Sequence, residues 1–340
     1  MKYKSCHLLE KGLYIGKDYI SHCCLLPTTG VAPIKLFPPL DVSDIDIEDL
    51  IKIKREYKEM FKRGEIPPAC RDCFSLEELD WPDDNEINCL YFAHWSHCNC
   101  NCIYCYFDPE REKNNSYNPP KVLPFLEKMK SKGMLNTASK GYMSFSGGEC
   151  TILEEFSDIL RFLFEIGSQK IIINSSGIKY DNLIAEGIQK GIVSCTISLD
   201  SADRELYKKI KQQDSFDKVV ENIKKYVSVQ SPDNYDGIRV KYIILPGINS
   251  DNKDIEKWLK LVKSLGVNHI ILDFETVWFF KYRNEIPDKF IKMLFNVEKR
   301  AKQLNIKLSY YSHAMQALKD FDEKAEKSFL VKLKRFLFSI

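Results

Sequence analysis

The sequence predicts a parallel α/β fold that is open rather than closed. Three observations support this prediction. Six short apolar segments alternate with six amphipathic segments from about residue 86, each apolar segment precedes its amphipathic partner, and 340 residues suffice to bury a substantial core. Repeated strand–helix units pair in parallel through right-handed crossovers. Six repeats fall short of the eight that close a barrel, so we expect an open, three-quarter barrel, although a doubly wound sheet fits the same periodicity.

The chain is expected to have three parts. The apolar segments predict strands over 87–93, 141–145, 170–173, 194–199, 239–245 and 269–273, and helical spacing of apolar residues predicts helices over 120–133, 151–167, 180–190, 203–228, 251–265 and 287–304. Prolines crowd residues 27–39, and a charged helix is expected over 46–63. We therefore expect a loop-rich, cysteine-containing N-terminal unit (1–85), a partial barrel (86–310) and a C-terminal amphipathic helix (311–340).

Composition and charge exclude several classes of protein. The chain is 44% hydrophobic and 29% charged, which is typical of a soluble globular protein. Its 50 Lys and Arg nearly balance its 48 Asp and Glu, which argues against a broad nucleic-acid-binding surface. No apolar run approaches ~18 residues, so no membrane span is expected. Charges interrupt the N-terminal segment too early for a secretory signal, and a cytoplasmic protein is predicted.

Cysteines carry the strongest chemical signal. All twelve lie within the first 195 residues, and clustered cysteines in a reducing compartment more often bind metal than form disulfides. Directly after the first predicted barrel strand, Cys98, Cys102 and Cys105 have the spacing C-x3-C-x2-C. Three thiolates on one loop can bind three irons of a 4Fe–4S cluster and leave the fourth iron open. A zinc site is the alternative, and Cys100 joins the others only if the loop turns locally.

This pattern, with the aromatic Tyr104 before its last cysteine, resembles the radical S-adenosylmethionine (SAM) superfamily. The resemblance implies a partial (β/α)6 barrel whose open iron binds the amino and carboxylate groups of SAM. It also implies reductive cleavage of SAM to a 5′-deoxyadenosyl radical, which abstracts hydrogen from a substrate. A reductant such as flavodoxin or ferredoxin is then an expected partner.

Later strand ends supply further candidate residues. The segment SGGEC after the second strand resembles the GGE motif of the same superfamily, in which Gly147 and Gly148 let backbone approach the ligand and Glu149 accepts hydrogen bonds from the SAM ammonium. The resemblance implies further SAM contacts at Ser175, Ser176, Ser198, Asp200 and Lys241, although ordinary turn chemistry explains each one separately. Asp273 and Glu275 end the sixth strand as candidate substrate contacts, or as a solvated strand end.

The N-terminal cysteines predict a second metal site. Cys6, Cys23, Cys70 and Cys73, with Cys24 as a substitute for Cys23, can hold an auxiliary 4Fe–4S cluster or zinc, or remain buried thiols. Their pattern resembles the auxiliary-cluster domain called SPASM, which normally follows the barrel. That resemblance implies a peptide or protein side chain as substrate. The alternatives are a sugar or other small metabolite as substrate, or a zinc-stabilised binding module without catalysis.

Overall fold

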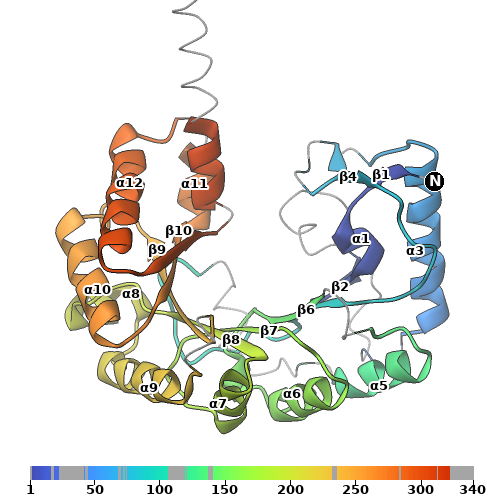
Figure 1. Ribbon diagram of the computed structural model, residues 1–340, viewed down its shortest axis with the longest axis horizontal. Coiled ribbons are helices and arrows are strands. Elements are labelled where there is room, and N and C mark those ends of the chain that lie inside the picture. The colour runs from blue at the N-terminus through green and yellow to red at the C-terminus, as the bar shows by residue number, and fades with distance from the viewer. Residues whose placement is uncertain are drawn as a thin grey trace, which may run out of the picture. The chain divides into compact units, whose positions relative to one another are not determined.

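Two compact units make up the computed structural model of the chain (Figure 1). The first unit comprises Met1–Asn99, Phe107–Ser175 and Asp181–Cys195, and the second comprises Cys100–Tyr106, Ser176–Tyr180 and Thr196–Ile340. The residues that the structure describes are 2–16, 19–22, 42, 45–67, 70–71, 73, 75–105, 119, 121–136, 141–231, 236–282, 285–311 and 313–321.

The first unit is built on five neighbouring strands. In spatial order they are β3 (Ile20–Ser21), β2 (Gly12–Gly16), β5 (Cys89–Ala93), β6 (Tyr142–Phe145) and β7 (Ile171–Ser175). Pairing is antiparallel between β2 and β3 and parallel between the others. Leu90 and Phe92 of β5 are fully buried, as expected for a parallel strand covered on both faces.

Helices of the first unit cover this sheet. The helices α5 (Leu123–Ser131), α6 (Phe156–Glu165) and α7 (Asn182–Gln189) lie in a row beside β6 and β7 (Figure 1). A short 3-10 helix, η3 (Cys150–Ile152), precedes α6. The remaining elements near the N-terminus are β1 (Tyr3–Ser5), α1 (His7–Lys11), α3 (Ile47–Lys62) and β4 (Glu77–Leu79), with β1 and β4 paired antiparallel.

The second unit repeats the strand–helix scheme. Its strands are the end of β8 (Val193–Ser198), then β9 (Ile238–Ile244), β10 (His269–Phe274) and β11 (Lys307–Tyr310), with parallel pairing from β9 to β11. Its helices are α8 (Arg204–Lys211), α9 (Phe216–Val229), α10 (Asn252–Ser264), α11 (Thr276–Tyr282) and α12 (Asp288–Gln303). The pairs Ile271–Lys241 and Asp273–Ile243 fix the register of β9 and β10. Residues 313–321 are also helical.

The predicted α/β class with parallel strands is confirmed, and all six predicted strands are present as β5 to β10. Two element predictions are wrong in detail. The single helix expected over 203–228 is two helices, α8 and α9, because Gln212 adopts a left-handed conformation with φ of 52°. The helix expected from 151 starts at Phe156, after η3.

The predicted N-terminal segment does not stand apart from the sheet. Gly12 to Gly16 pair in parallel with Cys89 to Ala93, so β2 extends the sheet of the first unit beyond β5. The division at residues 85 and 310 stays a prediction. Among the described residues, no helix is both long enough and apolar enough to cross a bilayer.

Candidate functional site

The cysteine loop leaves the end of β5 and is fastened to α8 by its backbone. The amide of Asn101 donates to the Lys211 carbonyl at 3.1 Å, and that of Ile103 donates to the Ile210 carbonyl at 3.0 Å. The Cys105 amide donates to the Cys102 carbonyl at 3.0 Å, which closes a turn. The loop backbone between the second and third motif cysteines is therefore held in place.

A buried ionic network lies under this loop in the second unit. The hydroxyl of Tyr104 donates to Asp200 Oδ2 at 2.6 Å, and Lys211 Nζ lies 2.7 Å from the Tyr104 oxygen and 2.5 Å from Asp200 Oδ2. The side chains of Asp200 and Lys211 are 0% and 2% exposed. Burial alone lowers the pKa of Lys211, but Asp200 and Tyr104 raise it well above its usual range. Lys211 thus stays charged and neutralises Asp200.

The same surroundings favour a thiolate at the middle motif cysteine. A hydrogen bond with Cys100 and the charge of Lys211 outweigh burial and lower the pKa of Cys102 to about 6. A thiolate is the form that binds iron. Sequence analysis missed Lys211, although a lysine on the buried face of an amphipathic helix, beside Tyr207 and Ile210, was a usable signal.

The glycines after β6 let two loops of the first unit touch. The amide of Gly148 donates to the Trp95 carbonyl at 3.2 Å, and that of Glu149 donates to the His97 carbonyl at 2.8 Å. A Cβ atom on Gly148 would overlap the His97 oxygen, and Gly147 has a φ of 106° that side chains rarely adopt. The close approach predicted for these glycines is thus toward the backbone that leads into Cys98.

The structure brings together two predicted SAM contacts, Glu149 and Ser175. Glu149 is 1% exposed, and its Oε1 accepts hydrogen bonds from Ser175 Oγ at 2.9 Å and Thr151 Oγ1 at 2.7 Å. Two hydroxyls therefore fix the orientation of this carboxylate. A hydrogen bond between a carboxylate and a charged donor is stronger than one between neutral groups.

The other predicted contacts lie at strand ends of the second unit. Asp200 Oδ1 accepts from the Ile243 amide at 2.7 Å, which ties β8 to β9. Ser198 is half-buried at the end of β8, and Ser176 Oγ accepts from the Ile178 amide at 3.4 Å. Burial lowers the pKa of Lys241, whose Nζ lies 5.5 Å from the Tyr311 ring centroid.

The two candidate substrate-contacting carboxylates are both engaged by backbone. Asp273 Oδ1 accepts from the amides of Phe274, His313 and Ala314 at 3.0, 3.1 and 2.9 Å. Glu275 accepts from the amides of Val277 and Trp278 at 2.7 and 2.6 Å, at the start of α11. These bonds give both carboxylates a structural role, and their catalytic role stays a prediction.

Comparison with known proteins identifies the domain around these loops. The model of the Radical SAM superfamily matches residues 93–255, which begin at the end of β5 and include the three motif cysteines. The chain carries a radical SAM domain. Radical SAM proteins are enzymes whose cofactors are a 4Fe–4S cluster and SAM, and they need an electron donor.

Curated relatives are similar over part of the chain. A probable GTP 3′,8-cyclase of Saccharolobus islandicus is 26% identical over 176 residues, which cover 52% of this chain and 53% of that one. One of Methanocaldococcus jannaschii is 25% identical over 181 residues, covering 52% and 59%. The chain thus spans little more than half the length of the curated relatives it matches.

Solved structures share the fold. Streptococcus suis SuiB bound to the precursor peptide SuiA has a TM-score of 0.51 at 12% identity, covering 84% of this chain and 59% of that one. SuiB bound to SAM has a TM-score of 0.50 at 13% identity, covering 77% and 63%. The fold therefore agrees with the radical SAM partial barrel.

The thiol loop of the radical SAM domain fits a 4Fe–4S cluster by the chemistry of its donors. Cys98 and Cys105 are exposed, and the half-buried Cys102 has a thiolate-favouring environment. In the part of the chain that the structure describes, no three His, Cys, Asp or Glu side chains are grouped around one metal position. The assignment of the three ligands consequently remains a proposal.

The N-terminal cysteines show no assembled site among the described residues. Cys6 is buried beside Leu9, whose amide lies 3.3 Å from the Cys6 sulfur, and Cys70 packs against the same apolar cluster. The Cys73 amide donates to the Cys70 carbonyl at 3.2 Å. Cys23 and Cys24 lie outside the described residues. The second metal site and the SPASM resemblance stay predictions.

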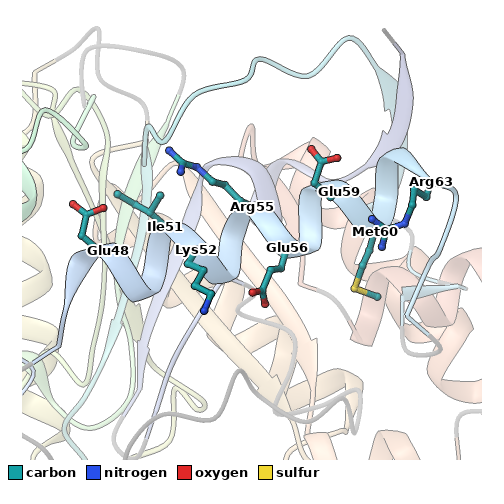
Figure 2. A pocket seen from close by; sticks show the side chains of 8 residues that line it. All are labelled: Glu48, Ile51, Lys52, Arg55, Glu56, Glu59, Met60 and Arg63. Atoms are coloured by element: carbon teal, nitrogen blue, oxygen red, sulfur yellow. The ribbon is translucent and has the colours of Figure 1, made fainter.

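A shallow hollow runs along the outer face of α3. Figure 2 shows the side chains that line it, which include three acidic, three basic and two apolar residues. They are Glu48, Ile51, Lys52, Arg55, Glu56, Glu59, Met60 and Arg63. None of the predicted site residues is among them, and the surface is typical of a solvated helix.

Proposed function

We propose that this chain is a radical SAM enzyme in which Cys98, Cys102 and Cys105 hold a 4Fe–4S cluster with one open iron. When bound, the reduced cluster supplies the electron that cleaves SAM to methionine and the 5′-deoxyadenosyl radical, which abstracts hydrogen from the substrate. The observation that carries this proposal is the position of the C-x3-C-x2-C loop at the start of the matched domain. The lowered pKa of Cys102 supports it further.

Residues of the chain prepare the site for SAM. Glu149, fixed by Ser175 and Thr151, is the proposed acceptor for the SAM ammonium group. Gly147 and Gly148 bring the backbone of Glu149 next to the start of the cysteine loop. The Lys211–Asp200–Tyr104 network holds the other end of the loop against α8. Ser176, Ser198 and Lys241 remain proposed contacts on the strand ends of the second unit.

Two substrate classes follow from different observations. The cysteine-rich N-terminal segment supports a peptide or protein side chain as substrate, through its resemblance to auxiliary-cluster domains. The names of the curated relatives instead support a small molecule, specifically a nucleotide. A purely structural zinc module is disfavoured, because radical SAM domains belong to enzymes.

Anaerobic reconstitution tests the proposal. We expect a brown protein that contains iron and sulfide and forms 5′-deoxyadenosine from SAM and dithionite. Cys102→Ala should abolish this product, whereas the matched control Cys195→Ala, a buried cysteine of β8, should retain it. A colourless protein that holds only zinc overturns the proposal. Deuterium transfer into 5′-deoxyadenosine from labelled GTP or from a labelled peptide then separates the two substrate classes.

A further inference from the structure

A histidine that the sequence does not single out stands at the carboxyl end of β10. His313 begins the helical segment 313–321. Asp273 contacts it at two places, the backbone amide and the imidazole ring. The His313 amide donates to Asp273 Oδ1 at 3.1 Å, and His313 Nδ1 lies 3.3 Å from Asp273 Oδ2. The carboxylate thus accepts a hydrogen bond from the backbone of His313 and forms an ion pair with its ring.

Aromatic rings hold the imidazole without covering it. The Phe279 ring centroid lies 4.8 Å from that of His313, and the Phe280 centroid lies 5.6 Å away. The side chain of His313 keeps 17% of its surface exposed, against 8% for Asp273. The ring is therefore restrained but still accessible.

The second unit contains a histidine that serves as a comparison. His269 opens β10 at its amino end, and both of its ring nitrogens are engaged, Nδ1 by Asp236 and Nε2 by Ser309, each at 2.8 Å. For His313 the carboxylate of Asp273 forms an ion pair on the Nδ1 side of the ring, and Nε2 is the nitrogen on the opposite side. Functional groups of parallel barrels gather at the carboxyl ends of strands, which is the end that His313 occupies.

One lysine lies on the same sheet face as the aspartate that pairs with His313. Lys241 of β9 lies on the same sheet face as Asp273, because it pairs with Ile271 in the register of β9 and β10. The carboxylates that act on His313 are Asp273 and Glu275, which also accept backbone amides from Ala314 and Val277. The Nζ of Lys241 lies over the ring of Tyr311. Burial lowers the pKa of His313, but Asp273 raises it by more, so the net pKa stands above its usual value.

We propose that His313 binds the substrate, with Nε2 donating a hydrogen bond to a phosphate or carboxylate oxygen, and that Asp273 is its positioning residue. An imidazole oriented by a carboxylate on its other nitrogen is a common arrangement for such a role. The inference rests on the proposed function, which places SAM at this end of the strands.

The test follows the imidazole signals of the reconstituted full-length protein by NMR, with SAM at saturation so that its own carboxylate is not the ligand observed. His313→Gln and His269→Gln assign the two signals. Inorganic phosphate and acetate are then titrated separately. We expect one of the anions to shift the His313 signal in a saturable way and to leave the His269 signal in place. A shift with phosphate indicates a phosphorylated substrate, and a shift with acetate indicates a carboxylate.

Two further variants sharpen the result. His313→Gln should weaken binding of that anion by roughly tenfold or more, since a charged donor is lost. Asp273→Asn should move the titration midpoint of the His313 signal to lower pH. The inference is overturned if neither anion shifts His313, or if both histidines shift alike. Because anion binding needs no SAM cleavage, this outcome is separate from an absence of 5′-deoxyadenosine, which would refute the proposed function instead.

Discussion

Replacing Lys211 by methionine tests the buried network beneath the cysteine loop. The substitution keeps most of the side-chain volume and removes an ammonium group 2.5 Å from Asp200. Asp200 is then a buried carboxylate whose remaining partners are the Tyr104 hydroxyl and the Ile243 amide among those described. Breaking a buried ion pair from one side costs about 3–5 kcal/mol, because the second charge is left uncompensated. We expect the free energy of unfolding to fall by about that amount.

Urea denaturation followed by circular dichroism measures the loss. Lys208→Met is the matched control, because Lys208 lies on the same helix and its ion pair with Asp214 is half exposed, so the solvent screens it. Adding Asp200→Asn to Lys211→Met should restore much of the lost stability, since the unpaired charge is gone.

A local readout separates the network from general packing. Hydrogen exchange should accelerate at the amides of Asn101 and Ile103, which donate to the backbone of α8 at Lys211 and Ile210. A Lys211→Met protein that matches Lys208→Met in stability and in exchange at these amides refutes the reasoning.

Three further predictions concern the first unit. Gly148→Ala places a Cβ atom on the His97 carbonyl oxygen, so we expect about 1–3 kcal/mol lower unfolding stability and less bound iron; an unchanged denaturation curve and iron content would contradict this. Burial lowers the pKa of His94 to about 3. Below pH ~6.5 the unfolded chain therefore binds a proton that the native state does not. The free energy of unfolding decreases as the pH is lowered, by about 2 kcal/mol at pH 5. His94→Phe should flatten this slope between pH 7 and 5, and a slope equal to that of the wild type would count against the buried neutral imidazole. Glu149→Gln keeps an acceptor for Ser175 but loses the charge, so SAM affinity measured by calorimetry should fall by roughly tenfold or more, whereas wild-type affinity would remove Glu149 from the SAM site.

Much of the fold is predictable because its signals are local. The strands β5 to β10 are apolar runs between amphipathic helices, and this alternation is visible without tertiary information. The break between α8 and α9 was not predictable in the same way. Gln212 takes the left-handed conformation that ends α8, and no Gly or Pro stands there to indicate the end of a helix. The strands β2 and β11 and the helix α11 were not predicted, although β2 and β11 are as long as β5 and β6. They lie outside the six strand–helix repeats, so the alternation that identifies the other elements gives no signal for them.

In the candidate site, too, residues in local motifs were predictable and residues that depend on tertiary contacts were not. The cysteine spacing and the SGGE segment are short motifs, and the contact between Glu149 and Ser175 agrees with the strand-end positions predicted for them. His313 becomes informative only through Asp273, a partner far along the chain. The buried face of α8 gives a local signal for Lys211, but its partner Tyr104 is again distant in sequence. The engagement of Asp273 by three amides is likewise a tertiary feature that sequence spacing does not reveal.

Electron–nuclear double resonance of the reduced protein with isotope-labelled SAM tests the central claim most directly. If three cysteines hold the cluster and its fourth iron is open, the spectrum should show hyperfine coupling from 15N in the SAM amino group and from 17O in its carboxylate. Cys102→Ala should remove the iron–sulfur signal altogether. A cluster that shows neither coupling, and that opens to SAM only after Cys100→Ala, would mean that the fourth iron is bound by the chain itself and would contradict the account.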